Sequence, residues 1–175
     1  RMLGDSRDKV ELTANLNKTV CEAMLQREDR ERGGLAGAPK FPQEPLLLFM
    51  LDQALSSREL NLLGFVTRAL EGMGRGGIYD QVAGGFHRYS VDAEWLVPHF
   101  EKMLYNQSQL TLLYLLAYRF TGNKYFMRIC EQTVAYVLRD MQLPEGGFYS
   151  ATDADSEGVE GLFFLWTVEE INHAL

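Results

Sequence analysis

Apolar residues recur at helical spacing through most of this 175-residue chain, and the breaks between these stretches alternate in length. The breaks near 56 and 121 are short, whereas the connections 30–44, 74–97 and 142–166 are long and each contains a double glycine. Because alternate connections of antiparallel helices lie at opposite ends, we expect all three long loops at one end. The pattern predicts an all-α fold made of helical hairpins.

Helix signals divide the chain into six predicted helices, over about 8–29, 45–56, 60–73, 98–120, 124–141 and from 167 onward. The expected start signals are first-position prolines, an N-cap asparagine and two capping boxes: Pro45, Pro98, Asn123, Ser56–Glu59 and Thr167–Glu170.

The segments 46–51 and 104–118 are apolar nearly all round, as expected of inner helices that are buried on most sides. Inner helices paired with outer amphipathic helices indicate a curved or closed (α/α) array, with the long loops around a pocket at one rim. We expect the charged run 27–34 to be a solvated helix end, and 146–154 with 161–167 to form a short β-hairpin.

Composition and motifs argue against several classes of function. The formal net charge is -7 and no basic stripe follows a helix face, which argues against a nucleic-acid partner. The longest apolar stretches are too short to cross a bilayer, so we expect no membrane partner. Cys21 and Cys130 form no CxxC and no Cys/His spacing, and nucleotide-binding and serine-elbow motifs are missing. We therefore predict a cytoplasmic protein without a metal or cofactor.

The segment 84–105, GGFHRYSVDAEWLVPHFEKMLY, holds two of the three histidines. If Pro98 starts a helix, His99 lies in its first turn, where the helix dipole lowers the pKa of an imidazole and keeps it neutral for general-base chemistry. Lys102 and Asn106 would then share a polar face that looks into the pocket, while His87 lies on the preceding loop. The alternative is that both histidines only hydrogen-bond the loop to the helix.

Acidic and aromatic side chains are also dense in the long loops. Rings beside an arginine and carboxylates fit a sugar, whose C–H faces stack on rings while its hydroxyls take charged partners. A pair of acids could instead serve glycoside hydrolysis, or could merely cap turns. For Phe163, Phe164 and Trp166 we favour packing of loops onto helix ends. The run 153–161 resembles the start of a calcium loop but has Phe164 at its twelfth position, which argues against calcium.

Four motifs carry a family resemblance: APKFP, GGFHRYSVDAEWLVPHFEKMLY, GGFYSATDADSEG and EGLFFLWTVEEI. Together they resemble the YyaL-like, spermatogenesis-associated thioredoxin-domain family, from about Gly33 to the end of the chain. The resemblance implies a six-hairpin (α/α) toroid related to N-acylglucosamine 2-epimerases and six-hairpin glycosidases. Residues 1–175 would be the early part of that toroid, an incomplete ring, with the family's thioredoxin-like domain absent.

The chain departs from the family pattern at two places. Asp80-Gln81 stands where the family usually has Asp-His, and Asn106-Gln107 stands where it usually has Asp-Asn. Each change removes an ionisable group, which leaves His87 and His99 as the stronger catalytic candidates.

The leading hypothesis is a carbohydrate-active toroid that catalyses epimerase- or isomerase-type proton transfer on a small sugar or glycan. The predicted catalytic residues are His87, His99, Asp92 and Glu101. The predicted substrate-binding residues are Arg88, Tyr89, Trp95, Lys102, Asn106, Tyr79, Asp153 and Asp155. The alternatives are a glycoside hydrolase-like activity and a non-catalytic toroid that binds a glycan or protein beside a redox module. Because an incomplete ring exposes apolar helix faces, we also expect a homo-oligomer or a partner chain that completes it.

Overall fold

The computed structural model describes residues 15–175, and it confirms the all-α prediction. Its helices are α1 (Leu16–Gln26), α2 (Glu44–Ser57), α3 (Leu60–Arg75), α4 (Leu104–Thr121), α5 (Lys124–Tyr136) and α6 (Val168–Ala174), with a π-helical turn at Val137–Met141 after α5. The predicted helical residues 8–14 lie outside the described part of the chain. None of the helices from residue 15 onward is long and apolar enough to span a membrane.

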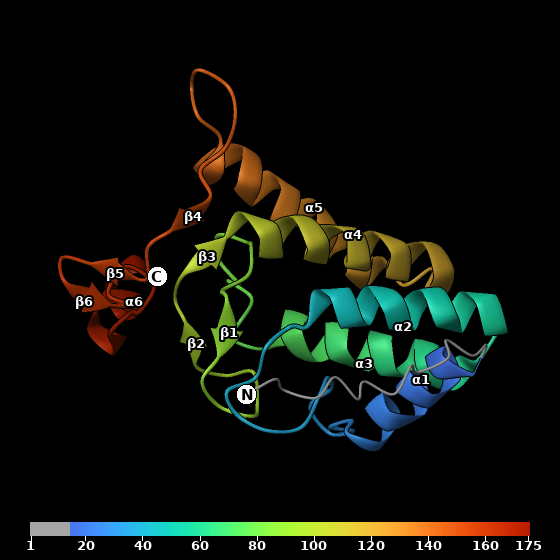
Figure 1. Ribbon diagram of the computed structural model, residues 1–175. Coiled ribbons are helices and arrows are strands. Elements are labelled where there is room, and N and C mark those ends of the chain that lie inside the picture. The colour runs from blue at the N-terminus through green and yellow to red at the C-terminus, as the bar shows by residue number, and fades with distance from the viewer. Residues whose placement is uncertain (1–14) are drawn as a thin grey trace, which may run out of the picture.

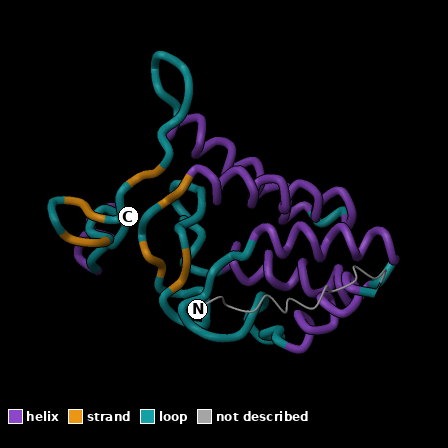
Figure 2. The backbone as a smooth tube through the Cα atoms, viewed as in Figure 1, coloured by secondary structure: helices purple, strands orange, loops and turns teal. Residues whose placement is uncertain are grey.

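Two antiparallel hairpins, α2–α3 and α4–α5, form the body of the molecule, and α2 packs against α4 (Figures 1 and 2). Their shared core is apolar and includes Phe65, Met73 and Tyr114, each with no exposed side chain. The Tyr114 hydroxyl donates a hydrogen bond of 2.6 Å to the carbonyl of Leu70, which ties the second hairpin to the first. This bond satisfies the one polar atom that Tyr114 brings into the core.

The three long loops lie at one end of the helices, while the short α2–α3 and α4–α5 turns lie at the other, as Figure 1 shows. We call the loop end the rim. Lys40 and Ser90 exchange backbone hydrogen bonds of 2.7 and 2.9 Å, which join the first loop to the second. Strand β3 (Lys102–Met103) pairs with β4 (Ala151–Thr152) and joins the second loop to the third. The prediction of a common rim is therefore confirmed.

The predicted helix start at Pro98 is wrong. Residues Pro98–His99 form strand β2, which pairs antiparallel with β1 (Tyr89–Ser90), and α4 begins only at Leu104. The backbone from 98 to 103 forms its hydrogen bonds with other segments and not within a helix. The carbonyl of Glu101 accepts a hydrogen bond from the amide of Arg88, and β3 pairs with β4. A proline at a first helical position is a local signal, and these pairings across the rim override it.

The predicted hairpin between 146–154 and 161–167 is also wrong. Instead, β4 pairs with β3, and a tight hairpin joins β5 (Asp155–Ser156) to β6 (Val159–Glu160). Its turn residues Glu157 and Gly158 have φ angles of 55° and 78°. Positive φ at both central residues matches the twist of a two-residue hairpin, and glycine supplies one of them without strain.

Two of the three N-terminal helix caps predicted from the sequence are present in the structure. The Asn123 side chain accepts the amide hydrogen of Tyr125, and Thr167 with Glu170 forms the predicted capping box. The predicted box at Ser56–Glu59 is wrong, because α2 runs on to Ser57 and α3 has no side-chain cap.

Replacing Thr167 with alanine is expected to lower the stability of α6 by about 1 kcal/mol, because one amide hydrogen bond at the helix start is lost. Hydrogen–deuterium exchange of residues 168–174 measures this change. Thr167→Ser, which keeps the hydroxyl, is the matched control. Equal exchange in the alanine variant and the wild type would contradict the role of this cap.

Candidate functional site

A chain of four charged or titratable side chains lies on one side of the segment 98–101. Nδ1 of His99 lies 2.7 Å from Oε1 of Glu160, and its Nε2 lies 3.7 Å from Oε2 of Glu101. That same Glu101 oxygen accepts a hydrogen bond of 3.0 Å from Nη1 of Arg88. The His99 side chain remains 26% exposed, so an external molecule can reach it. We call these four residues the His99 cluster.

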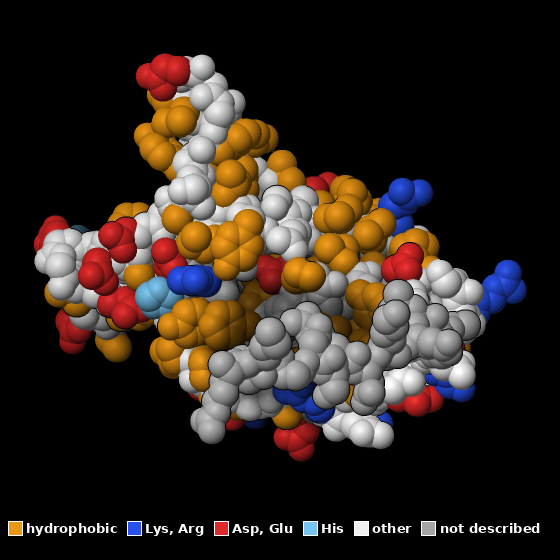
Figure 3. All heavy atoms as spheres, in the orientation of Figure 1, with side chains coloured by type: hydrophobic (Ala, Val, Ile, Leu, Met, Phe, Trp, Pro, Cys, Tyr) orange, Lys and Arg blue, Asp and Glu red, His pale blue; other side chains and the backbone are white. Residues whose placement is uncertain are grey.

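His99 stands at the end of a stack of three rings, followed by Tyr89 and then Phe41. Tyr89 lies 5.0 Å from the His99 ring at an interplanar angle of 23°, and Phe41 lies 4.6 Å from Tyr89 at 25°. Both faces of Tyr89 are thus covered, so this ring is placed to orient His99 rather than to stack on a sugar. Figure 3 shows histidine, acidic and basic side chains side by side on this end of the molecule, next to apolar ones.

His87 lies on the opposite side of the same segment. Successive residues of an extended chain point to opposite faces, and here Pro98 and Phe100 line a cavity of about 610 Å³ together with His87. The cavity lining does not include His99. The two imidazoles therefore do not line the same cavity. His99 lies in β2 and not in the first turn of a helix, so the predicted effect of a helix dipole on its imidazole does not apply.

The His87 imidazole is buried, at 2% exposure, and makes T-shaped contacts with the rings of Phe100 and Phe164. Its Nδ1 lies 3.0 Å from the carbonyl of Phe100. Burial, reinforced by the nearby charge of Lys102, lowers the pKa of His87 to about 4. At neutral pH this imidazole is therefore uncharged.

This lowered pKa predicts a pH dependence of stability. Between pH 6.5 and 4 the unfolded chain binds a proton at residue 87 that the folded chain does not. The free energy of unfolding should therefore fall as the pH drops through this window, by at most about 1.4 kcal/mol per pH unit. Urea unfolding of the wild type and of His87→Asn across this range measures the difference. Parallel pH profiles for the two proteins would contradict the buried neutral imidazole.

One predicted site residue, Asp92, is occupied by hydrogen bonds within its own loop. The carboxylate of Asp92 accepts the amide hydrogens of Glu94, Leu96 and Val97 and the hydroxyl of Ser90, and these bonds lower its pKa although burial opposes them. Asp92 therefore stabilises the conformation of the loop 90–97.

Trp95 and Tyr79 are buried, at 1% and 2% exposure. The indole Nε1 of Trp95 donates to the carbonyls of Arg32 and Gly33, so this ring is packing for the first loop and not an open sugar platform. The Tyr79 hydroxyl donates to the side chain of Gln132, although its ring does line the His87 cavity. Burial raises the pKa of Tyr79 to about 12.

Lys102 and Asn106 do not share a helical face, because Lys102 belongs to β3 and Asn106 to α4. The Lys102 ammonium bonds Asp80 at 2.8 Å and the Gly84 carbonyl at 2.9 Å. The amide of Asn106 donates to the buried carboxylate of Glu44, whose pKa is raised by burial. Asn106 thereby connects α4 to the start of α2, away from solvent at 2% exposure.

Asp153 and Asp155 flank the start of the β5–β6 hairpin, and both are exposed. Asp153 lines a second cavity, of about 470 Å³, with Lys102. Over residues 15–175 no group of three or more histidine, cysteine or acidic side chains is arranged to hold a metal ion.

Two glutamines at the positions that depart from the family pattern, Gln81 and Gln107, make hydrogen bonds to the backbone. Gln81 donates to the carbonyls of Gly74 and Gly76. The Gln107 side chain accepts from the amide of Phe86 and donates to its carbonyl, at 2.7 and 2.6 Å. Gln107 therefore fixes the backbone immediately before His87.

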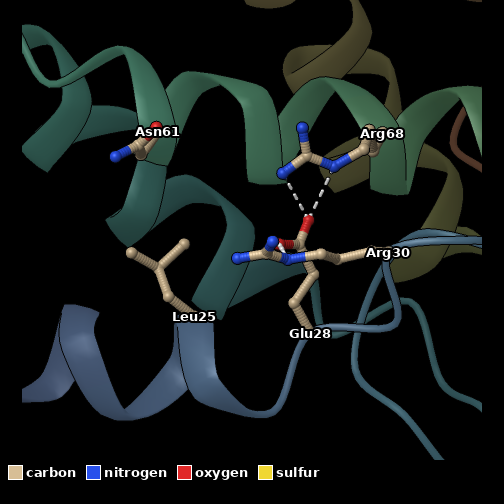
Figure 4. Close-up of a pocket in the computed structure, with 5 residues that line it drawn as sticks. All are labelled: Leu25, Glu28, Arg30, Asn61 and Arg68. Atoms are coloured by element: carbon tan, nitrogen blue, oxygen red, sulfur yellow. Dashed lines mark hydrogen bonds and ion pairs between the residues drawn. The ribbon is translucent and has the colours of Figure 1, made fainter.

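The charged run 27–34 is exposed at Arg27, Arg30, Glu31 and Arg32, as predicted of a solvated helix end, but not at Glu28. Glu28 is 1% exposed in its side chain and accepts Nη2 and Nε of Arg68 on α3 at 2.6 and 2.7 Å, with Arg30 beside it at 3.7 Å. Figure 4 shows this carboxylate between the two arginines, in a pocket of about 430 Å³ that Leu25 and Asn61 also line. Arg68 and Arg30 are both paired with Glu28, so this carboxylate links the first loop to α3.

The sequence hypothesis did not assign Glu160 or Phe41 to the site. Glu160 reaches His99 from 61 positions away, through the β5–β6 hairpin. The one feature of the sequence that indicated Glu160 was its position among the acidic residues of the third long loop.

No family model matches the chain. It is 41% identical over 172 residues to spermatogenesis-associated protein 20 of Rattus norvegicus, and 40% identical over 173 residues to the Homo sapiens protein of that name. Each alignment covers 93% of this chain. The chain is therefore homologous to one region of spermatogenesis-associated protein 20. It spans 22% of the length of these relatives.

The fold of this chain is similar to that of solved (α/α) toroids. A sugar epimerase from a ruminal bacterium superposes with a TM-score of 0.67 at 18% identity, covering 77% of this chain and 37% of that one. Cellobiose 2-epimerase of Spirochaeta thermophila gives 0.64 at 16% identity, covering 81% and 41%. A family 76 mannosidase of Bacteroides thetaiotaomicron gives 0.56 at 17%, covering 66% and 31%. The helical hairpins of this chain thus form part of a toroid ring, as predicted.

Proposed function

We propose that the His99 cluster catalyses proton transfer at the carbon next to the carbonyl of a sugar, as in epimerisation or aldose–ketose isomerisation. The observation that carries this proposal is the geometry of His99, whose Nδ1 lies 2.7 Å from Glu160 while the side chain stays 26% exposed. A carboxylate on one imidazole nitrogen fixes the tautomer and leaves the lone pair of the other nitrogen free to accept a proton.

In the proposed reaction, Nε2 of His99 takes the proton from C2 of the open-chain sugar. The electron pair of the broken C–H bond forms an enediolate, whose oxygen Arg88 stabilises. The same imidazolium returns its proton to C2 from the other face after the intermediate turns, which gives the epimer. To give the ketose, the O2 proton first moves to the O1 oxyanion, and the imidazolium then returns its proton to C1. Glu101, between Arg88 and His99, holds both side chains in place and balances the positive charge that develops on the imidazole.

The fold supports this assignment. The solved structures that share the toroid include a sugar epimerase, a cellobiose 2-epimerase and a D-mannose isomerase. Because function resides in sites rather than in folds, the residues of the His99 cluster carry the assignment.

Proton NMR of sugars in D₂O tests the proposal. The full-length natural protein is incubated with mannose, N-acetylglucosamine and cellobiose, and the C2–H signal of each sugar is followed. Solvent exchange at C2 of at least one of them is expected. Unchanged C2–H signals for all three, with folded protein, would contradict the proposal.

Glycoside hydrolysis is the second candidate, and one observation favours it: two carboxylates, Glu101 and Glu160, approach the two nitrogens of a single imidazole. Paired carboxylates can protonate a leaving oxygen and activate water. Release of sugar from a glycoside in H₂¹⁸O, with label in the product and no C2 exchange, would select hydrolysis. Heat on sugar binding without either product would select a non-catalytic glycan-binding toroid.

A further inference from the structure

The cavity of about 470 Å³ lies between the end of α5 with its π-helical turn, the β4–β5 strands and the Phe163–Phe164 segment. Its volume falls in the range of small-molecule sites. Rings and polar side chains both line it, principally Tyr136, Phe163, Phe164, Lys102, Arg139 and Asp153. None of the four residues of the His99 cluster belongs to this lining.

A buried ammonium group supplies a hydrogen-bond donor to this cavity. The Lys102 side chain is 1% exposed, and its three N–H groups have two protein acceptors in the described chain, Asp80 and the carbonyl of Gly84. One donor is left for a ligand. The Tyr136 ring, with its centroid 4.3 Å from Nζ, holds the ammonium in place.

An acceptor and an open ring complete the lining. Asp153 accepts one hydrogen bond, from the amide of Asp155 at 3.2 Å, which leaves carboxylate capacity for a ligand hydroxyl. Phe163 is 74% exposed, and Trp166 beyond it is 59% exposed. The expectation that these two rings pack loops onto helix ends is therefore wrong, since most of each ring faces solvent.

The charges exclude an anionic ligand. Two cations, Lys102 and Arg139, face three carboxylates, those of Asp80, Asp140 and Asp153. Lys102 and Arg139 are paired with Asp80 and Asp140, which leaves the unpaired charge negative. A donor, a free carboxylate and an exposed ring face suit a neutral polyhydroxylated ring.

We infer that this cavity binds one pyranose ring of a glycan, at a site separate from the His99 cluster. The His87 cavity shares Ala83, Phe163 and Phe164 as walls with it. A second sugar unit linked to the first can therefore lie across the two phenylalanine rings. This binding site does not depend on the proposed reaction, because no residue of the His99 cluster contacts it.

Isothermal titration calorimetry on the full-length natural protein tests the inference, with cellobiose, mannobiose and N,N′-diacetylchitobiose as probes. At least one disaccharide should bind. Asp153→Ala should weaken its binding about tenfold, because a charge-assisted hydrogen bond is lost. Phe163→Ala should weaken it about threefold to tenfold through lost stacking.

Two controls make the result specific. Phe148→Ala removes a ring that is 44% exposed but lies outside the cavity lining, and it should leave the Kd unchanged. His99→Asn should also leave this Kd unchanged, which separates the inference from the proposed reaction. Circular dichroism checks that each variant is folded. Binding of none of the three disaccharides, or equal Kd values for wild type, Asp153→Ala and Phe163→Ala, would overturn the inference.

Discussion

Replacing His99 with asparagine is expected to slow C2 exchange by about 10²- to 10⁴-fold, the usual loss when a positioned general base is removed. Asparagine keeps polarity and similar size but has no nitrogen that accepts a proton at neutral pH. The 26% exposure of His99 and its place on a two-residue strand predict that the fold survives. Initial rates of deuterium incorporation, measured by NMR at saturating sugar, give the effect on kcat.

Matched variants show whether the loss belongs to His99 itself. His173→Asn, on the exposed helix α6, should leave the rate unchanged. Glu160→Gln should lower the rate less than His99→Asn and shift its pH profile, because the orienting carboxylate loses its charge. A full exchange rate in His99→Asn would remove His99 from the reaction.

Replacing Trp95 with alanine is expected to destabilise the rim by about 3–5 kcal/mol, the range for removing a large buried ring. Trp95 is 1% exposed and holds the first loop through the carbonyls of Arg32 and Gly33, at 3.1 and 3.2 Å. The glycines around it allow this close packing, since a Cβ at Gly72 would lie 2.0 Å from the carbonyl oxygen of Arg32 and 3.2 Å from the indole.

Hydrogen–deuterium exchange of 27–43 and 76–103 in the full-length protein measures the Trp95 effect, as faster exchange in both loops. The control is the other tryptophan. Trp166 is 59% exposed, so Trp166→Ala should change stability by no more than about 0.5 kcal/mol. Unchanged protection of both loops in Trp95→Ala would show that this ring does not hold the rim together.

The common rim could be predicted from the sequence because loop lengths alone dictate it: short turns at one end force the long connections to the other. The inner helices and the caps at Asn123 and Thr167 are also local signals, and the structure confirms both caps. The start of α4 could not be predicted, because Pro98 is a helix signal that strand pairing with Tyr89–Ser90 overrides.

The site resisted prediction for a related reason. The sequence does not show whether an aromatic side chain at the rim is buried or exposed. In the structure, glycines pack closely around Trp95, which is buried, whereas Phe163 is exposed. Spacing in the sequence likewise gives no sign that Glu160, rather than Asp92, reaches an imidazole. The one-residue alternation that separates His87 from His99 depends on a strand that the sequence presents as a helix.

A crystal structure of the full-length protein soaked with a sugar that shows C2 exchange tests the account most directly. The account predicts density for a sugar with C2 within reach of Nε2 of His99 and an oxygen bonded to Arg88. Sugar density that occupies only other parts of the protein, with His99 still exposed and no sugar near it, would contradict the account.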